Sequence, residues 1–99
     1  MKEYFTSGLL SESKLVLAVP GELKQILLLT DGVNNAKLVC YDVSSVSEIN
    51  NSNVLAALVA PGANLFKQLT FPPLLFKAGL YCLLSGTGAN YVVILSRES

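Results

Sequence analysis

Turn signals divide this chain into short apolar segments, and their spacing is the feature that most restricts the fold. The segments are bounded by proline, glycine or polar loop residues and cover 14–19, 22–30, 36–42, 54–60, 65–71, 74–77, 80–84 and 91–96. They have the length of β-strands, and turn signals at intervals of roughly 8–12 residues are typical of a β-sandwich or barrel. The sequence therefore predicts an all-β fold, an antiparallel β-sandwich of jelly-roll-like type with about seven or eight short strands.

Helix is a competing prediction only for 22–29 and 54–60, each about two turns long, and the adjacent Pro-Gly pairs suit turns better than helix interiors. With 99 residues the chain is long enough for one core and too short for a second, so we expect a single domain over 1–99. Residues 1–13 precede the first predicted strand and are assigned to an extended N-terminal arm.

Several predicted strands are apolar on both faces. In 91–96, Tyr91 and Val93 share one face while Val92 and Ile94 share the other, whereas a strand with one solvated face alternates apolar and polar residues. Charged residues make up 14% of the chain, against about 25% in an ordinary soluble domain, and between 49 and 96 they are only Lys67 and Lys77. We therefore expect copies of the same chain to cover part of the outer surface. The alternative is an unusually apolar monomer.

Large apolar side chains on the later segments are the candidates for such a subunit interface. They are Phe71, Phe76, Tyr81, Leu83, Tyr91 and Val93.

The residues that usually carry catalysis or bind metals are missing or scattered. There is no histidine, so a nucleophile would lack the usual base, and the seven acidic residues form no recognisable pair. The polar loop 44–53 contains Glu48, Asn50, Asn51 and Asn53, which would suit calcium or sugar, but a solvated connection explains it better. We predict a protein that is not an enzyme and has no cofactor or metal.

Charge and hydropathy patterns exclude two classes of partner. The formal net charge is zero, which gives no electrostatic attraction to nucleic acid. The longest apolar runs, such as 54–60, are far shorter than a membrane-spanning helix, so no membrane partner is expected. The amino terminus lacks the pattern of a signal peptide, which favours synthesis in the cytoplasm.

The stretch Gly86-Thr87-Gly88 resembles the start of a phosphate-binding loop but lacks its other requirements. The segment that follows is β-branched and aromatic, so it predicts a strand instead of a helix, and no lysine follows the glycines. We interpret the stretch as a hairpin turn between 80–84 and 91–96, with glycines that permit positive φ angles.

The two cysteines, Cys40 and Cys82, each lie inside an apolar run. Buried free thiols are the favoured interpretation, and a disulfide between them is the alternative.

The order of several short motifs supports a resemblance. Val-Pro-Gly-x-Leu, Leu-Leu-Thr-Asp-Gly, Ala-Lys-Leu-Val-Cys-Tyr-Asp, Phe-Pro-Pro-Leu-Leu-Phe-Lys-Ala-Gly-Leu-Tyr and Leu-Ser-Gly-Thr-Gly-Ala follow one another over about 5–95. Together they resemble the small all-β virion proteins of tailed bacteriophages.

That resemblance implies a short β-sandwich or jelly roll that works as a homo-oligomer, commonly a trimer, without a cofactor. The expected function is that of a capsid decoration or cement protein, made in the host cytoplasm and located in the virion. Its partners would be itself and the major capsid protein or another virion protein. The alternatives are a fibre or receptor-binding module that holds sugar and a head–tail connection component. The resemblance is structural and assigns no functional residue.

Overall fold

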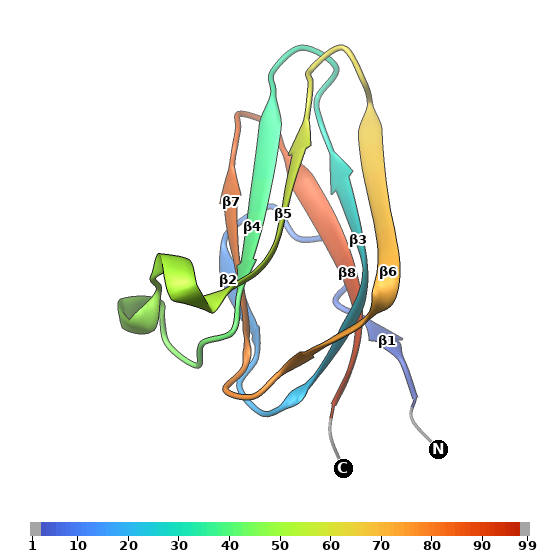
Figure 1. The fold of residues 1–99 in the computed structure, drawn as a ribbon. Coiled ribbons are helices and arrows are strands. Elements are labelled where there is room, and N and C mark those ends of the chain that lie inside the picture. The colour runs from blue at the N-terminus through green and yellow to red at the C-terminus, as the bar shows by residue number, and fades with distance from the viewer. Residues whose placement is uncertain (1–2, 98–99) are drawn as a thin grey trace.

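The computed structural model describes residues 3–97 and consists of two antiparallel sheets packed face to face (Figure 1). One sheet has the strand order β1-β8-β3-β6 and the other β2-β7-β4-β5. The all-β sandwich predicted from the spacing of turn signals is confirmed. The strands are β1 (Phe5–Thr6), β2 (Lys14–Leu17), β3 (Gly21–Leu29), β4 (Ala36–Tyr41), β5 (Val54–Ala60), β6 (Phe66–Phe76), β7 (Leu80–Ser85) and β8 (Asn90–Arg97).

The strands pair in a nested order. The pairs β1 with β8, β2 with β7, β3 with β6 and β4 with β5 are all antiparallel. Pairing of β3 with β8 and of β4 with β7 then joins them into the two sheets. A chain that doubles back between β4 and β5 and is then rolled up has this order, which is that of an eight-stranded jelly roll. The segments 22–29 and 54–60, where helix competed, are strands.

The hydrophobic core lies between the sheets and is built from alternate residues of the strands. In β4, for example, Ala36, Leu38 and Cys40 are buried, while Lys37 between them is exposed. Full burial of one leucine or isoleucine side chain contributes about 1.5–3 kcal/mol. The buried apolar side chains of the other strands are Leu17, Leu23, Ile26, Leu28, Leu58, Ala60, Phe76, Leu80, Cys82, Tyr91, Val93 and Leu95.

A β-bulge in β3 changes which residues face the core. Leu23 is paired with Leu95 of β8 and Gln25 with Ile94, so Lys24 is an extra residue. Leu23 and Ile26 are therefore both buried although they are three residues apart. At the same place β6 has the three residues 71–73 opposite Lys24. The sequence predicted separate strands at 65–71 and 74–77, but β6 is continuous, because proline is tolerated on an edge strand.

The N-terminal segment packs on the sandwich, which corrects its assignment to an extended arm. β1 pairs with β8, and the amides of Ser7 and Leu10 each donate at 2.9 Å to carbonyls of β8. The hydroxyl of Tyr91 also donates to the carbonyl of Glu12 at 2.8 Å. Residues 3–13 thus run along the sandwich, while residues 1–2 of the predicted arm lie outside the described residues.

The connection Gly86-Thr87-Gly88 passes from one sheet to the other, so the predicted hairpin between β7 and β8 is wrong. β7 pairs with β2 and β4, whereas β8 pairs with β1 and β3. The predicted positive φ angles are confirmed at 120° for Gly86 and 72° for Gly88. A Cβ atom on Gly86 would lie 2.4 Å from the carbonyl oxygen of Asn35, so this turn packs closely against the β3–β4 loop.

Asp42 fixes the loops at the opposite end of the sandwich. Its carboxylate accepts hydrogen bonds from the amides of Lys77 and Ala78 at 3.0 and 2.8 Å, and from that of Gly79 at 3.4 Å. In the sequence, Asp42 ends a predicted strand and is expected to cap the loop that directly follows it. Its partners, however, belong to the β6–β7 turn, about 35 residues further along the chain.

Candidate interaction surface

The predicted interface residues separate into two groups. Phe76, Tyr91 and Val93 are at most 1% exposed and lie in the core of the single chain. They present no surface to a partner, so we no longer assign them to the candidate interface. Tyr81 and Leu83 lie on β7 and face outward, Tyr81 half-buried and Leu83 exposed. The side chain of Phe71 lies outside the described part of the structure.

Tyr81 and Leu83 belong to an apolar surface on the outside of the β2-β7-β4-β5 sheet. The pairing register places Leu83 beside Val39 of β4, and Val39 beside Ala57 of β5. Val59, the outward residue that follows Ala57, is 51% exposed. We call this the outer face; it consists of Leu15, Val39, Ala57, Val59, Tyr81 and Leu83.

Few charges interrupt the outer face. The four strands of this sheet carry only two charged residues, Lys14 and Lys37. Lys37 pairs with Val59 on one side and Ser85 on the other, at one end of the face. The described residues of these strands place no acidic side chain there. The outer face is thus apolar at its centre with a cation at its margin, the kind of surface that excludes water when covered.

The contact between Ser13 and Leu84 indicates which backbone groups of β7 point toward β2. The hydroxyl of Ser13, just before β2, accepts from the amide of Leu84 at 2.8 Å and donates to its carbonyl at 3.5 Å. The backbone groups of Leu84 therefore point toward β2. Because every second residue of a strand points its backbone groups the same way, those of Cys82 also face β2. Cys82 and its β4 partner Cys40 are consequently a non-hydrogen-bonded pair.

The same alternation leaves backbone groups of β5 open. In β4 the groups of Leu38 and Cys40 point toward β5, where their partners are Leu58 and Ala56. The direction of the backbone groups alternates along a strand, so the amides and carbonyls of Ala57 and Val59 point away from β4. Among the described residues β5 has no strand on that side, and it contains neither charge nor proline. A register shift at Leu55 interrupts its pairing with β4 near the start of the strand, but the edge from Ala56 to Ala60 lacks the charge or proline that often protects an edge strand.

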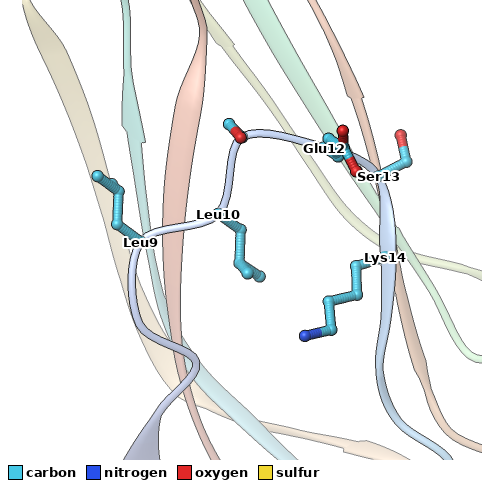
Figure 2. Close-up of a pocket in the computed structure, with 6 residues that line it drawn as sticks. Leu9, Leu10, Glu12, Ser13 and Lys14 are labelled. Atoms are coloured by element: carbon cyan, nitrogen blue, oxygen red, sulfur yellow. The ribbon is translucent and has the colours of Figure 1, made fainter.

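A surface hollow of about 440 Å³ lies along the segment between β1 and β2 (Figure 2). The residues that line it include Glu12, Ser13 and Lys14. The Ser13 hydroxyl is already bonded to the backbone of Leu84, and the lining contains no histidine. The hollow therefore does not present a serine paired with a histidine base.

The polar loop after β4 is organised by its own side chains. It forms two 3₁₀ turns, η1 (Val46–Glu48) and η2 (Asn51–Asn53), and projects from the sandwich (Figure 1). The side-chain oxygen of Asn50 accepts from the amide of Ser52, and the amide side chain of Asn53 donates to the carbonyl of Glu48. Within residues 3–97 no cluster of three or more histidine, cysteine or acidic side chains could hold a metal ion.

Asp31 is held by the turn that it begins. Its carboxylate accepts from the amides of Asn34 and Val33 at 2.7 and 2.9 Å and from the side chain of Asn34 at 2.8 Å. These bonds, the one from the Asn34 amide foremost, lower the pKa of Asp31 below its ordinary value of 3.8. In the sequence Asp31 begins an Asp-Gly turn, where a bond between its side chain and the backbone ahead of it is expected, and this expectation is confirmed.

The lowered pKa of Asp31 predicts a sign for the effect of acid on stability. A carboxylate with a lower pKa in the folded state stabilises it above the unfolded pKa, and that contribution is lost as pH falls through the folded pKa. Below about pH 3.8, the wild type should therefore lose stability more steeply than Asp31→Asn. Urea unfolding of both proteins between about pH 7 and 2 measures this, and parallel curves would contradict it.

No helix among the described residues has the length and apolar character needed to cross a membrane. Comparisons with protein-family models, with curated proteins and with solved structures returned no match for this chain.

Proposed function

We propose that this protein is a non-enzymatic structural protein that assembles with copies of itself through the open edge of β5 and the adjoining outer face. The observation that carries the proposal is the uncharged β5 edge. Its backbone groups at Ala57 and Val59 have no strand partner on the side away from β4 among the described residues, and the side chains of β5 itself are all apolar. An extended strand from another copy would satisfy these groups and bury the apolar side chains in the same step.

The chemistry of the surface supports association with another copy over a charged partner. The net charge of the chain is zero, so copies do not repel one another. Antiparallel pairing of β5 with β5 of another copy relates the two chains by a two-fold axis, so this edge alone makes a dimer. A trimer, which the sequence resemblance implies, would use the outer face in another arrangement.

The setting that we propose for this assembly is the capsid of a tailed bacteriophage. The support is the sequence resemblance together with a jelly-roll sandwich, a fold used by viral capsid proteins among others. In this role the oligomer would lie on the capsid surface and reinforce contacts between major capsid subunits. It would do so by burial of apolar surface, without catalysis.

Placing a charge at the β5 edge tests the assembly. The wild type is expected to form a stable oligomer at micromolar concentration, and Ala57→Lys should weaken it by roughly 100-fold or more, because like charges would meet across the new pair. Asn51→Lys is a matched control, since it adds the same charge on the exposed loop between β4 and β5. Light scattering and native mass spectrometry give the oligomer number and the dissociation constant.

The outcomes of that experiment are distinct. A wild type that stays monomeric at micromolar concentration would reject assembly altogether. An oligomer that Ala57→Lys leaves intact would reject the β5 edge as the contact. For the virion role, binding to purified capsids that lack this protein is expected. Binding to host glycans without binding to capsids would instead favour a recognition module.

A further inference from the structure

The two cysteines of the chain face each other across two neighbouring strands inside the core. Cys40 on β4 and Cys82 on β7 are direct partners in the pairing register, and both are fully buried. Their Sγ atoms are 3.8 Å apart, and both thiols are free. The proposed assembly uses neither of them.

The backbone geometry of the pair is compatible with a disulfide. Cys40 and Cys82 are a non-hydrogen-bonded pair, as the contact of Ser13 with Leu84 shows, and Cα atoms in such pairs are about 4.5 Å apart. Disulfides have Cα separations of about 4.4–6.8 Å, so the strands need not move apart or together. The sulfurs have to approach from 3.8 Å to about 2.05 Å, a distance within reach of small side-chain rotations.

The folded core protects the thiols from reaction. Neither side chain is exposed, so a small-molecule disulfide cannot reach either sulfur without opening of the sandwich. The hydrogen bond with Cys40, together with burial, raises the pKa of Cys82 well above its ordinary value. A protonated thiol is a poor nucleophile. In the unfolded chain, by contrast, both thiols are accessible and have ordinary reactivity.

We propose that Cys40 and Cys82 form a disulfide site that is filled only while the chain is unfolded or folding, so that the folded protein preserves the redox state in which it folded. The oxidant is a small-molecule disulfide of the glutathione type. One cysteine thiolate attacks it, forms a mixed disulfide and releases one reduced thiol. The second thiolate then attacks the protein sulfur of the mixed disulfide, forms the Cys40–Cys82 bond and releases the second reduced thiol. The protein loses two hydrogens, which the oxidant gains.

The bond would stabilise the fold. The chain has only two cysteines, so this is the one intrachain disulfide available, and it joins residues 42 positions apart. Cross-linking a loop of this length removes chain entropy from the unfolded state. We expect the thermal unfolding midpoint to rise by roughly 10 °C, less any strain in the core.

The experiment exposes reduced wild-type protein to the same glutathione mixture in two ways, during refolding and after folding. In one, reduced wild-type protein is unfolded in denaturant and refolded with reduced and oxidised glutathione; in the other, folded reduced protein is incubated with the same mixture. Remaining thiols are then alkylated in denaturant and the protein is analysed by intact mass, peptide mapping and thermal unfolding. The refolded protein should lack two hydrogens, contain the Cys40–Cys82 bond and unfold at higher temperature. The folded protein should keep both thiols for hours.

Single variants provide the control. Cys40→Ala and Cys82→Ala should take up at most one glutathione and show no rise in unfolding temperature with oxidant. Refolded wild type that carries two glutathiones instead of the Cys40–Cys82 bond would overturn the proposal. So would folded wild type that oxidises as fast as the unfolded chain. The wild-type comparison needs no variant, so the proposal can be rejected even where an alanine variant folds poorly.

Discussion

Replacing Gly86 by alanine is expected to lower the free energy of unfolding by about 3–5 kcal/mol, because two independent costs act at this position. The φ angle of 120° lies in a region that side-chain-bearing residues rarely adopt. The new Cβ would also lie 2.4 Å from the carbonyl oxygen of Asn35, a backbone atom that can move only with its loop. Urea unfolding monitored by circular dichroism measures the loss.

Gly8 is the matched control for this substitution. Its φ angle is 74°, also positive, but a Cβ added there would meet no atom within 4 Å. Gly8→Ala should therefore cost only the conformational term, about 1–2 kcal/mol. Equal losses for the two variants would show that the close contact between the β7–β8 turn and the β3–β4 loop does not restrict Gly86.

Replacing Phe76 by alanine is expected to destabilise the single chain by about 3–5 kcal/mol through the cavity that it leaves in the core. Phe76 is 1% exposed, and its ring packs so closely on Gly21 that a Cβ there would lie 2.8 Å from ring atom Cζ. Its neighbour Leu75 is 62% exposed on the same strand. Leu75→Ala should accordingly change stability by no more than about 0.5 kcal/mol.

The Phe76 experiment also separates core from interface. Unfolding is measured at concentrations where the protein is monomeric, and the oligomer number is determined in parallel. A Phe76→Ala protein with unchanged monomer stability and a weakened oligomer would return Phe76 to the interface, against its burial in the single chain. A loss of monomer stability alone places it in the core.

The positions of most strands follow from local sequence, because turn residues and strand-length apolar runs are short-range signals. The predicted 54–60 coincides with β5, and 80–84 differs from β7 by one residue. The sheet to which a strand belongs is a long-range property. Adjacent runs around Gly86-Thr87-Gly88 predict a hairpin, yet β7 and β8 find different partners because each sheet is completed by strands far away in the chain.

The candidate surface was only partly predictable for a related reason. When both faces of a strand are apolar, a period of two cannot tell which face is buried. Tyr91 and Val93 therefore entered the predicted interface although they fill the core, while Leu83 did lie outside. The bulge at Lys24 changes which residues of β3 face the core, and no pattern in the neighbouring sequence predicts it. The open edge of β5 depends on the strand order within the sheet, which the sequence pattern does not predict.

The nested pairing of the strands also has a consequence for how the chain is made. Within residues 3–97, only the β4–β5 pair joins strands consecutive in the chain, whereas each pair outside it closes a longer loop, ending with β1 against β8. Because β8 also lies between β1 and β3, that sheet remains incomplete until β8 has been synthesised. Folding is thus expected to proceed outward from the β4–β5 pair, and slowly, because the other pairs join strands that are far apart in the chain.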